Sequence, residues 1–345
     1  MKKLIRPQHL KKGDKIAAVS LSWGGAGEPE LRWRYEQGKK RLQEIFGLEV
    51  VEMSHTLSGD GYLRAHPEKR AEDLMAAFAD KSVKGIFSCI GGDDTVRLLP
   101  YIDFDVIREN PKVFIGYSDT TANHFMMYKA GLASFYGAGI LTGFAENVCM
   151  HDYTVEWINK TLFDNNPPGN IPASDKYVCQ YLEWTEENKD IKRQTAPNTG
   201  YEVLQGKGKV TGHLIGGCIE VLEMIKGTEL FPPLQDFDGA ILFLETSECS
   251  PQPEYIKWWL MNYGAMGVLD RINGIIFGKP AFGKYYDEYR TEIKTILAEY
   301  GRADLPVMYN ASFGHNEPKC CLPYGALAEL DCDNKTFSVL EAGCV

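Results

Sequence analysis

Val113-Phe114-Ile115-Gly116-Tyr117-Ser118-Asp119-Thr120-Thr121 is the segment of this chain with the clearest succession of strand, turn and helix. Its first three residues are apolar and two of them are β-branched, which is typical of a short buried strand. Residues 120–130 have the pattern of a helix, and Gly131 follows at the position of its C-cap. Ser118 therefore lies between the end of a strand and the start of a helix.

A serine at such a turn can act as a nucleophile, because its hydroxyl is held out of the sheet. The first N–H groups and the dipole of the following helix favour negative charge that develops beside it. The segment departs from the strict G-x-S-x-G pattern, since Thr120 stands where the second glycine would be. The alternative is a strand-to-helix turn in which Ser118 or Asp119 only caps the helix.

The N-terminal half alternates between strands and helices. Apolar runs predict strands, and helical periodicity predicts helices, as follows: strands at 15–20, 48–51, 84–90 and 113–115, helices at 31–46 and 67–80. This alternation predicts an α/β fold with a doubly wound, mostly parallel sheet and helices on both faces. The Gly-rich loop at residues 22–27 lacks the G-x-G-x-x-G spacing of dinucleotide-binding proteins.

Sites in doubly wound sheets lie at the carboxyl ends of strands. Both Ser118 and the pair Gly91-Gly92 fall at such ends. A glycine pair lets backbone N–H groups approach a ligand closely, so we predict an oxyanion hole from the N–H groups of Gly92 and Asp119. The alternative for the glycine pair is a plain tight turn.

Between about residues 150 and 205 the periodic apolar pattern gives way to proline, glycine and asparagine clusters and to runs of charged residues. We predict an N-terminal α/β domain in residues 1–160, a linker in 161–205 and a C-terminal β-rich domain in 206–345. Short strands and glycines in the last part favour a small β-barrel accompanied by helices.

Composition limits the function. The net charge of −10 argues against a nucleic-acid partner. No apolar run is long enough to span a bilayer, and the N-terminus lacks the apolar core of a signal peptide. The nine cysteines form no C-x-x-C pair, which predicts neither a zinc site nor a disulfide framework and favours a cytoplasmic location. A cysteine nucleophile is disfavoured, because no cysteine stands between a strand and a helix as Ser118 does.

A nucleophilic serine needs a base and a carboxylate that orients the base. Among seven histidines, His315 is the best base, because its Gly- and Pro-flanked loop would present the ring rather than pack it. Glu245 follows four apolar residues and would be costly to bury without a partner, so it is the best orienting residue. The alternative rivals for that role are Glu248, Asp94 and Asp119.

Four motifs together resemble a known family. They are Gly91-Gly92-Asp93-Asp94, Gly116-Tyr117-Ser118-Asp119, Leu244-Glu245 and Phe313-Gly314-His315. This set is similar to the serine peptidases that comprise LD-carboxypeptidases and microcin C self-immunity proteins, and the resemblance extends over nearly the whole chain. It implies a catalytic triad of Ser118, Glu245 and His315, a homodimer, and no metal or cofactor.

The resemblance leans toward the microcin-immunity branch, which hydrolyses the amide that joins a peptidyl group to a modified nucleotide. The other branch removes terminal D-Ala from murein tetrapeptide. The implied partner is thus a small peptide, peptidyl-nucleotide or muropeptide substrate. We also expect Asp93 and Trp184 to contact it. Trp184 would stack on a base, and the alternative for it is a cover over the domain junction.

Two other classes of protein stay open at this point. One is a nucleotide- or flavin-binding module in which Ser118 contacts a phosphate. The other is a non-catalytic binding protein that uses the same cleft.

Overall fold

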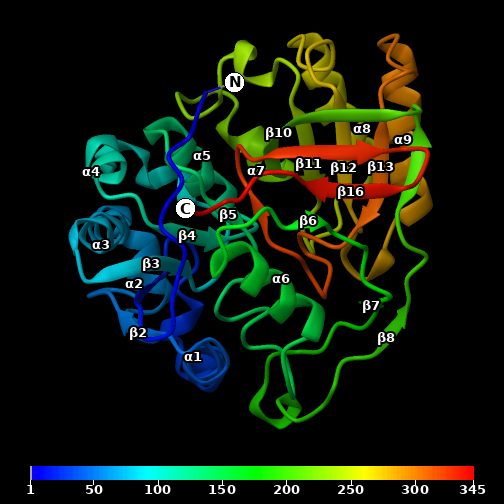
Figure 1. Cartoon of the computed structure of the whole chain (residues 1–345). Helices are drawn as coiled ribbons and strands as arrows, with labels where there is room; N and C mark the ends of the chain where they lie inside the picture. Colours follow the sequence, from blue (N-terminus) through cyan, green and yellow to red (C-terminus); the bar gives the residue numbers. More distant parts are fainter. Residues whose placement is uncertain (1) are drawn as a thin grey trace.

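The computed structural model describes residues 2–345 and consists of two lobes, each built on a β-sheet (Figure 1). The first lobe contains β1 (Lys15–Val19), α1 (Arg32–Phe46), β2 (Glu49–Glu52), α2 (Asp60–Ala65), α3 (Pro67–Ala79), β3 (Val83–Ser88), α4 (Phe104–Glu109), β4 (Val113–Gly116), α5 (Thr120–Ala130) and β5 (Phe135–Tyr136). A connecting region follows, with α6 (Asp152–Leu162), β6 (Gly169–Asn170), β7 (Lys176–Val178), β8 (Thr195–Pro197) and β9 (Glu202–Gln205).

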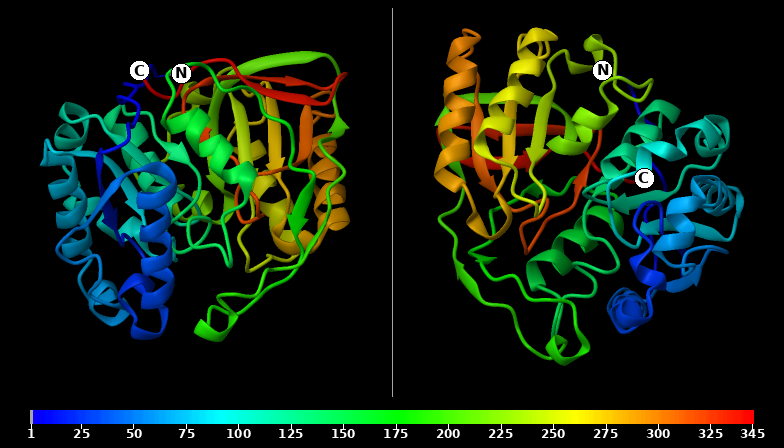
Figure 2. Two further views of the ribbon diagram at one scale, coloured as in Figure 1. Left: turned by 60° about the horizontal axis from the view of Figure 1, so that its bottom comes forward. Right: turned by 180° about the vertical axis from the view of Figure 1, so that it is seen from behind.

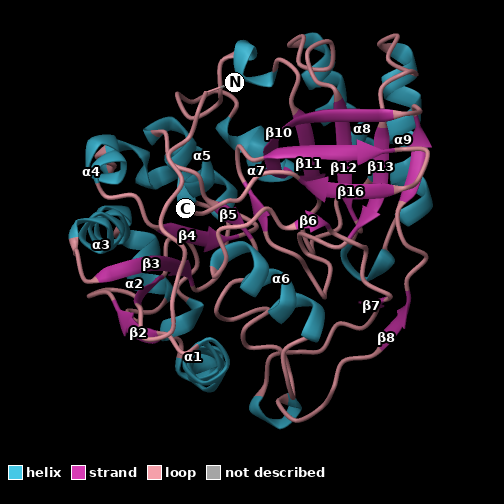
Figure 3. Ribbon diagram, in the orientation of Figure 1, coloured by secondary structure: helices cyan, strands magenta, loops and turns pink. Residues whose placement is uncertain are grey.

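The second lobe contains β10 (Lys209–Cys218), α7 (Ile219–Ile225), β11 (Ile241–Glu245), α8 (Pro253–Ala265), β12 (Gly274–Gly278), α9 (Tyr286–Glu299), β13 (Val307–Ala311), β15 (Leu327–Asp331) and β16 (Thr336–Val339). Between β13 and β15 the chain returns to the first lobe and adds β14 (Leu322–Pro323) to its sheet. Short 3-10 helices connect these elements: η1 (Gly25–Gly27), η2 (Pro29–Leu31), η3 (Thr95–Tyr101), η4 (Glu186–Asn188), η5 (Leu234–Phe237) and η6 (Ala281–Gly283). Figure 3 shows how long loops separate the two sheets around α6.

The first sheet has the strand order β14-β5-β4-β3-β1-β2, in which β1 to β5 are parallel and β14 is antiparallel to β5. Successive residues of β1 point to opposite faces, as in any strand. Ala17 and Val19 pack with α3 and α5, whereas Ile16 and Ala18 pack with α1. Helices therefore cover both faces, and the prediction of a doubly wound, mostly parallel α/β domain is confirmed.

The second sheet is mixed, with the order β6-β16-β15-β10-β11-β12-β13-β9. Strands β10 to β13 are parallel, and antiparallel strands flank them. Helices α7, α8 and α9 lie along one side of this sheet, as the view from behind shows (Figure 2). Within residues 2–345 the edge strands β6 and β9 do not pair with each other, so the expected small barrel is not confirmed.

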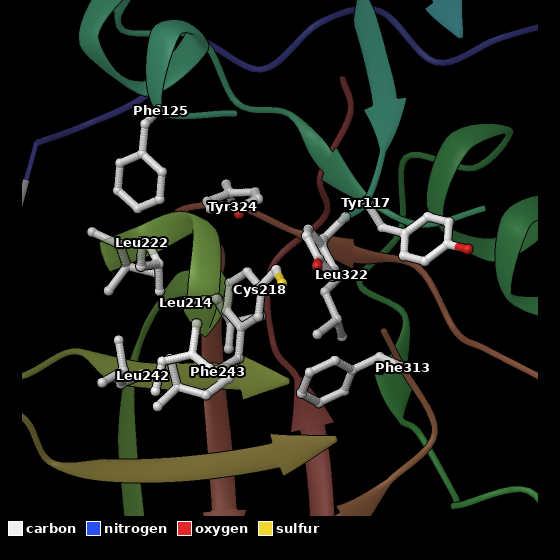
Figure 4. Packing of buried hydrophobic residues seen from close by; sticks show 14 of the residues in the cluster. Tyr117, Phe125, Leu214, Cys218, Leu222, Leu242, Phe243, Phe313, Leu322 and Tyr324 are labelled. Atoms are coloured by element: carbon white, nitrogen blue, oxygen red, sulfur yellow. The ribbon is translucent and has the colours of Figure 1, made fainter. Parts of the chain in front are cut away.

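The two lobes share one apolar core (Figure 4). The ring of Tyr324 lies 5.0 Å from that of Phe243 on β11 and 4.7 Å from that of His124 on α5. Phe125 of α5 packs on the same tyrosine, with 6.1 Å between the ring centroids. This packing fixes α5 against the second sheet.

The contact between α5 and β10 brings strand ends together. The backbone N–H of Cys218, the last residue of β10, donates to the Thr121 hydroxyl of α5 at 3.1 Å. The segment after β4 and the carboxyl ends of β10 and β11 therefore meet at one seam between the lobes. None of the helices in the described part of the chain has the length and apolarity that crossing a membrane requires.

Candidate active site

Ser118 occupies a strained turn at the seam. One residue, Tyr117, separates it from the end of β4. Its φ is +65°, which is rare for a residue with a side chain. The chain around it is crowded, because a Cβ at Gly91 would lie 2.8 Å from the Ser118 Cβ and 2.9 Å from its Oγ. Gly91 thus leaves the space that the serine hydroxyl occupies.

Glu245 and His315 form a buried pair. The Glu245 carboxylate is the last side chain of β11, and its Oε2 accepts from the Nδ1–H of His315 at 2.7 Å and from the His315 backbone N–H at 3.0 Å. Gly314 makes this approach possible, because its φ is +83° and a Cβ there would lie 2.5 Å from Glu245 Oε2. The carboxylate therefore fixes both the loop and the ring of His315.

Tyr136 connects this pair to the serine. Its hydroxyl donates to Glu245 Oε1 and accepts from the Ser118 backbone N–H at 3.2 Å. The ring of Tyr117, which precedes the serine, lies 4.9 Å from the ring of His315. The structure thus brings Ser118, Glu245 and His315, which are distant in sequence, to one place.

The imidazole of His315 lies between two carboxylates. Its Nε2 is 3.0 Å from Oε2 of Glu248, on the side opposite Glu245. Burial alone would lower the pKa of His315, but the charges of Glu245 and Glu248 and the hydrogen bonds to them raise it well above its ordinary value. The hydrogen bond from His315 in turn lowers the pKa of Glu248 to about 2.

The predicted oxyanion donors lie next to the serine. Within residues 2–345, the N–H groups of Gly92 and Asp119 make no hydrogen bond to another protein atom. The Asp119 carboxylate faces the other way and accepts from the Ser22 hydroxyl at 2.6 Å and from the Thr95 N–H at 2.8 Å. Asp119 therefore ties the first loop of the lobe to the turn that carries Ser118.

The remaining candidates have other surroundings. The Asp94 carboxylate forms ion pairs with Arg70 at 2.6 Å and with Arg97 at 3.0 Å, so its oxygens are already bound by two guanidinium groups. His124 is buried behind the turn, where its Nε2–H donates to the Gly116 carbonyl at 2.9 Å. Burial lowers the pKa of His124 to about 3, so it supports the end of β4 as a neutral ring.

The two expected substrate contacts differ. Asp93 has a side chain that is 68% exposed and lies 3.4 Å from Arg64. Trp184 is half-buried, with the guanidinium of Arg34 4.2 Å from its ring centre. Trp184 lines a cavity of about 670 Å³ in which most of the lining side chains are aromatic or acidic: Trp23, Trp33, Tyr181, Glu30, Glu183, Glu186 and Glu187. The backbone N–H of Trp23 donates to the carbonyl of Gly91 at 3.0 Å, so one residue of the cavity wall is bonded to the loop that packs against Ser118.

One cluster in the described residues has the spacing of metal ligands. The ligand atoms of Cys218, Glu245 and His315 lie within 4.8 Å of one another. Each of these atoms already has a protein partner, since Glu245 accepts from Tyr136 and His315, and the Cys218 thiol donates to Glu220 at 3.3 Å. We interpret the cluster as a hydrogen-bonded network.

Several members of the site had no signal in the sequence. Tyr136 lies on a strand of two residues, which periodicity does not detect. The buried Cys218 and the half-buried Glu220 lie where β10 passes into α7. In the sequence, only an acidic residue among apolar neighbours could have indicated this place. Glu248 was a rival for the place of Glu245, and the structure puts it on the opposite nitrogen of the same ring.

Both lobes of the chain match a known protein family. Residues 16–137 match the LD-carboxypeptidase N-terminal domain, and residues 211–330 match the LD-carboxypeptidase C-terminal domain. The chain is 31% identical to the microcin C7 self-immunity protein MccF of Escherichia coli over 338 residues, which cover 96% of this chain and 94% of that one.

Solved structures show the same fold. An MccF-like protein from Streptococcus pneumoniae in complex with AMP is 33% identical, with a TM-score of 0.88 over 95% of this chain and 98% of that one. The microcin C7 self-immunity protein MccF in complex with aspartyl sulfamoyl adenosine is 28% identical, with a TM-score of 0.86 over 99% of this chain and 100% of that one.

The two-lobed α/β fold is thus shared with the solved MccF structures. The chain belongs to the LD-carboxypeptidase family, which includes the MccF self-immunity proteins.

Proposed function

We propose that this protein is a serine hydrolase that uses a triad of Ser118, His315 and Glu245 to cleave the amide between a peptidyl group and a modified nucleotide. The observation that carries the proposal is the buried Glu245–His315 pair, 2.7 Å apart, which shares the Tyr136 hydroxyl with the Ser118 backbone. A base that is oriented by a buried carboxylate beside a serine at a strained turn is the arrangement that acyl transfer requires.

In this mechanism each group has one role. His315 Nε2 takes the proton of Ser118 as its hydroxyl attacks the scissile carbonyl, and later gives it to the leaving amine. Glu245 holds Nδ1–H, which fixes the tautomer and stabilises the imidazolium. The free N–H groups of Gly92 and Asp119 hold the oxyanion. Water then hydrolyses the acyl-enzyme by the same steps.

The nucleotide branch is supported by the cavity that Trp184 lines. Aromatic side chains such as Trp184 offer flat surfaces to a base, and the lining residues of this cavity include no lysine or arginine to bind a phosphate. We therefore expect the cavity to hold the nucleoside part of the substrate. The structure of the MccF-like protein from Streptococcus pneumoniae with AMP is consistent with such a role.

The second candidate is removal of terminal D-Ala from a murein tetrapeptide. The match of both halves of the chain to LD-carboxypeptidase domains favours it. The same triad would serve both reactions, since both transfer an acyl group to water.

Mass spectrometry of the products from a peptidyl adenylate analogue and a murein tetrapeptide tests the proposal. We expect cleavage of the first substrate, and a loss of roughly 10³-fold or more in Ser118→Ala with unchanged folding. Undiminished turnover in that variant would refute the serine mechanism. Cleavage of the tetrapeptide alone would assign the protein to the other branch.

The stacking role of Trp184 has its own comparison. Trp184→Ala should raise KM for the adenylate analogue by about tenfold and leave KM for the tetrapeptide unchanged. An equal effect on both substrates would assign Trp184 to the structure of the cavity instead. Homodimer assembly and a cytoplasmic location stay predictions, and sedimentation of the purified protein measures the first.

A further inference from the structure

The Glu248 carboxylate contacts the nitrogen of His315 that acts as the base in the proposed mechanism. The Nε2 of His315 has to receive the Ser118 proton, yet here it lies 3.0 Å from the Glu248 carboxylate. The imidazole is 6% exposed, whereas the Glu248 side chain is 64% exposed. Glu248 therefore reaches the ring from the solvent side.

A turn after β11 presents this carboxylate. Its first residue, Ser247, donates its N–H to the half-buried Glu220 at 2.8 Å, and the Ser250 N–H donates to the Ser247 carbonyl at 3.1 Å, which closes the turn. Among residues 2–345 the Glu248 carboxylate has no ion-pair partner other than His315. The backbone of the turn is thus anchored, while the side chain of Glu248 depends on one cation.

In the described part of the chain, the other groups that face His315 supply no free cation. Glu245 comes from β11, the Cys218 thiol from β10, and Tyr117 from the serine turn. Lys319 lies 3.7 Å from the centre of the Tyr117 ring, and its ammonium pairs with Glu317 at 2.8 Å. When His315 gives up its proton to act as a base, the Glu248 carboxylate loses its counter-ion. A carboxylate that loses its counter-ion in a partly enclosed site favours a new cation.

We propose that Glu248 selects substrates that carry a primary ammonium group on the acyl residue, and that this ammonium replaces His315 as the partner of Glu248. The proposal rests on the proposed function. On binding, the ammonium pairs with the carboxylate, and the Nε2–H proton of the released imidazolium passes to water. Neutral His315 can then accept the proton of Ser118.

The ammonium could be the α-amino group or a side-chain amine, and four acyl groups separate these sources. They are lysyl, Nα-acetyl-lysyl, norleucyl and Nα-acetyl-norleucyl, each prepared on both leaving groups of the proposed function, sulfamoyladenosine and D-alanine. Wild type should cleave at least one ammonium-bearing member about tenfold or more faster in kcat/KM than Nα-acetyl-norleucyl. Glu248→Gln should reduce this preference to below about threefold.

Glu254→Gln is the matched control, because Glu254 lies exposed at the start of α8 and makes no ion pair within residues 2–345. It should keep the wild-type preference. An equal preference in wild type and Glu248→Gln, or none in wild type, would overturn the proposal. Undiminished cleavage of these substrates by Ser118→Ala would instead refute the proposed function, so the two failures are distinguishable.

A second measurement does not depend on turnover. Histidine NMR of the resting protein should show the imidazole of His315 titrating at lower pH in Glu248→Gln than in wild type, because one of its two carboxylates is gone. Glu254→Gln should leave this titration where it is. An unchanged His315 titration in Glu248→Gln would also overturn the proposal.

Discussion

Replacing Tyr136 by phenylalanine removes one oxygen atom from the centre of the site. That hydroxyl donates to Glu245 and accepts from the Ser118 N–H, and its side chain is fully buried. The ring itself packs between Phe243 and Tyr324, with centroids at 5.5 and 6.3 Å, so Tyr136→Phe keeps the apolar contacts. The change isolates the polar role of the residue.

The expected cost has two parts. A hydrogen bond to a charged group contributes about 1.5–3 kcal/mol, and a buried N–H left without a partner costs about 1–3 kcal/mol. We therefore expect the free energy of unfolding to fall by about 3 kcal/mol. If half or more of this loss also affects the transition state, kcat/KM falls by about one to two powers of ten.

Tyr324→Phe is the control in the same core. Its hydroxyl donates to the Gly216 carbonyl at 2.7 Å, a neutral acceptor, so the expected loss of stability is about 1 kcal/mol with little change in kcat/KM. Urea unfolding followed by circular dichroism gives the free energies of unfolding. The rate of hydrolysis of whichever substrate the wild type cleaves, the peptidyl adenylate analogue or the murein tetrapeptide, gives kcat/KM. Equal losses of activity in the two variants would refute the role that we assign to Tyr136.

Two further predictions concern neighbouring residues. Gly314→Ala should lower kcat/KM by about a hundredfold or more, because its Cβ would lie 2.4 Å from Glu245 Cγ. Gly200→Ala is the control, because Gly200 has a φ of +80° and a Cβ there would meet nothing within 4 Å; it should lower the free energy of unfolding in urea by only about 1 kcal/mol, through backbone strain, and leave kcat/KM unchanged. Equal activity in the two variants would contradict the crowding argument. Burial lowers the pKa of His124 to about 3, so below about pH 6.5 the unfolded chain binds a proton that the folded chain does not. As the pH is lowered from about 6.5 toward 3, the free energy of unfolding therefore decreases by about 1.4 kcal/mol per pH unit. Unfolding measured between pH 4 and 7 should therefore show a flatter pH dependence for His124→Gln, and identical slopes would count against a neutral buried ring.

Local pattern was enough for much of the fold. The helix at residues 120–130 and its Gly131 cap have the predicted bounds in the structure, and the predicted helices at 31–46 and 67–80 differ from α1 and α3 by one residue each. Each has residues that favour a helix and a glycine or a turn at its end, so the information lies within a few residues. The two-residue strands β5 and β14 have no such pattern, because their pairing depends on the lobe packed against them.

Sequence also indicated the serine turn, the acidic residue after an apolar strand, and a histidine in a flexible-looking loop, since each carries a local sign of unusual burial or geometry. Only the tertiary structure decided which nitrogen of His315 faces Glu245 and which faces Glu248, and that Tyr136 joins the serine to the pair. These contacts join residues more than a hundred positions apart in places, and they exist only because two sheets present their carboxyl ends to one seam. A chain's local preferences set its strands and helices, but the distances between charged groups follow from how those elements pack.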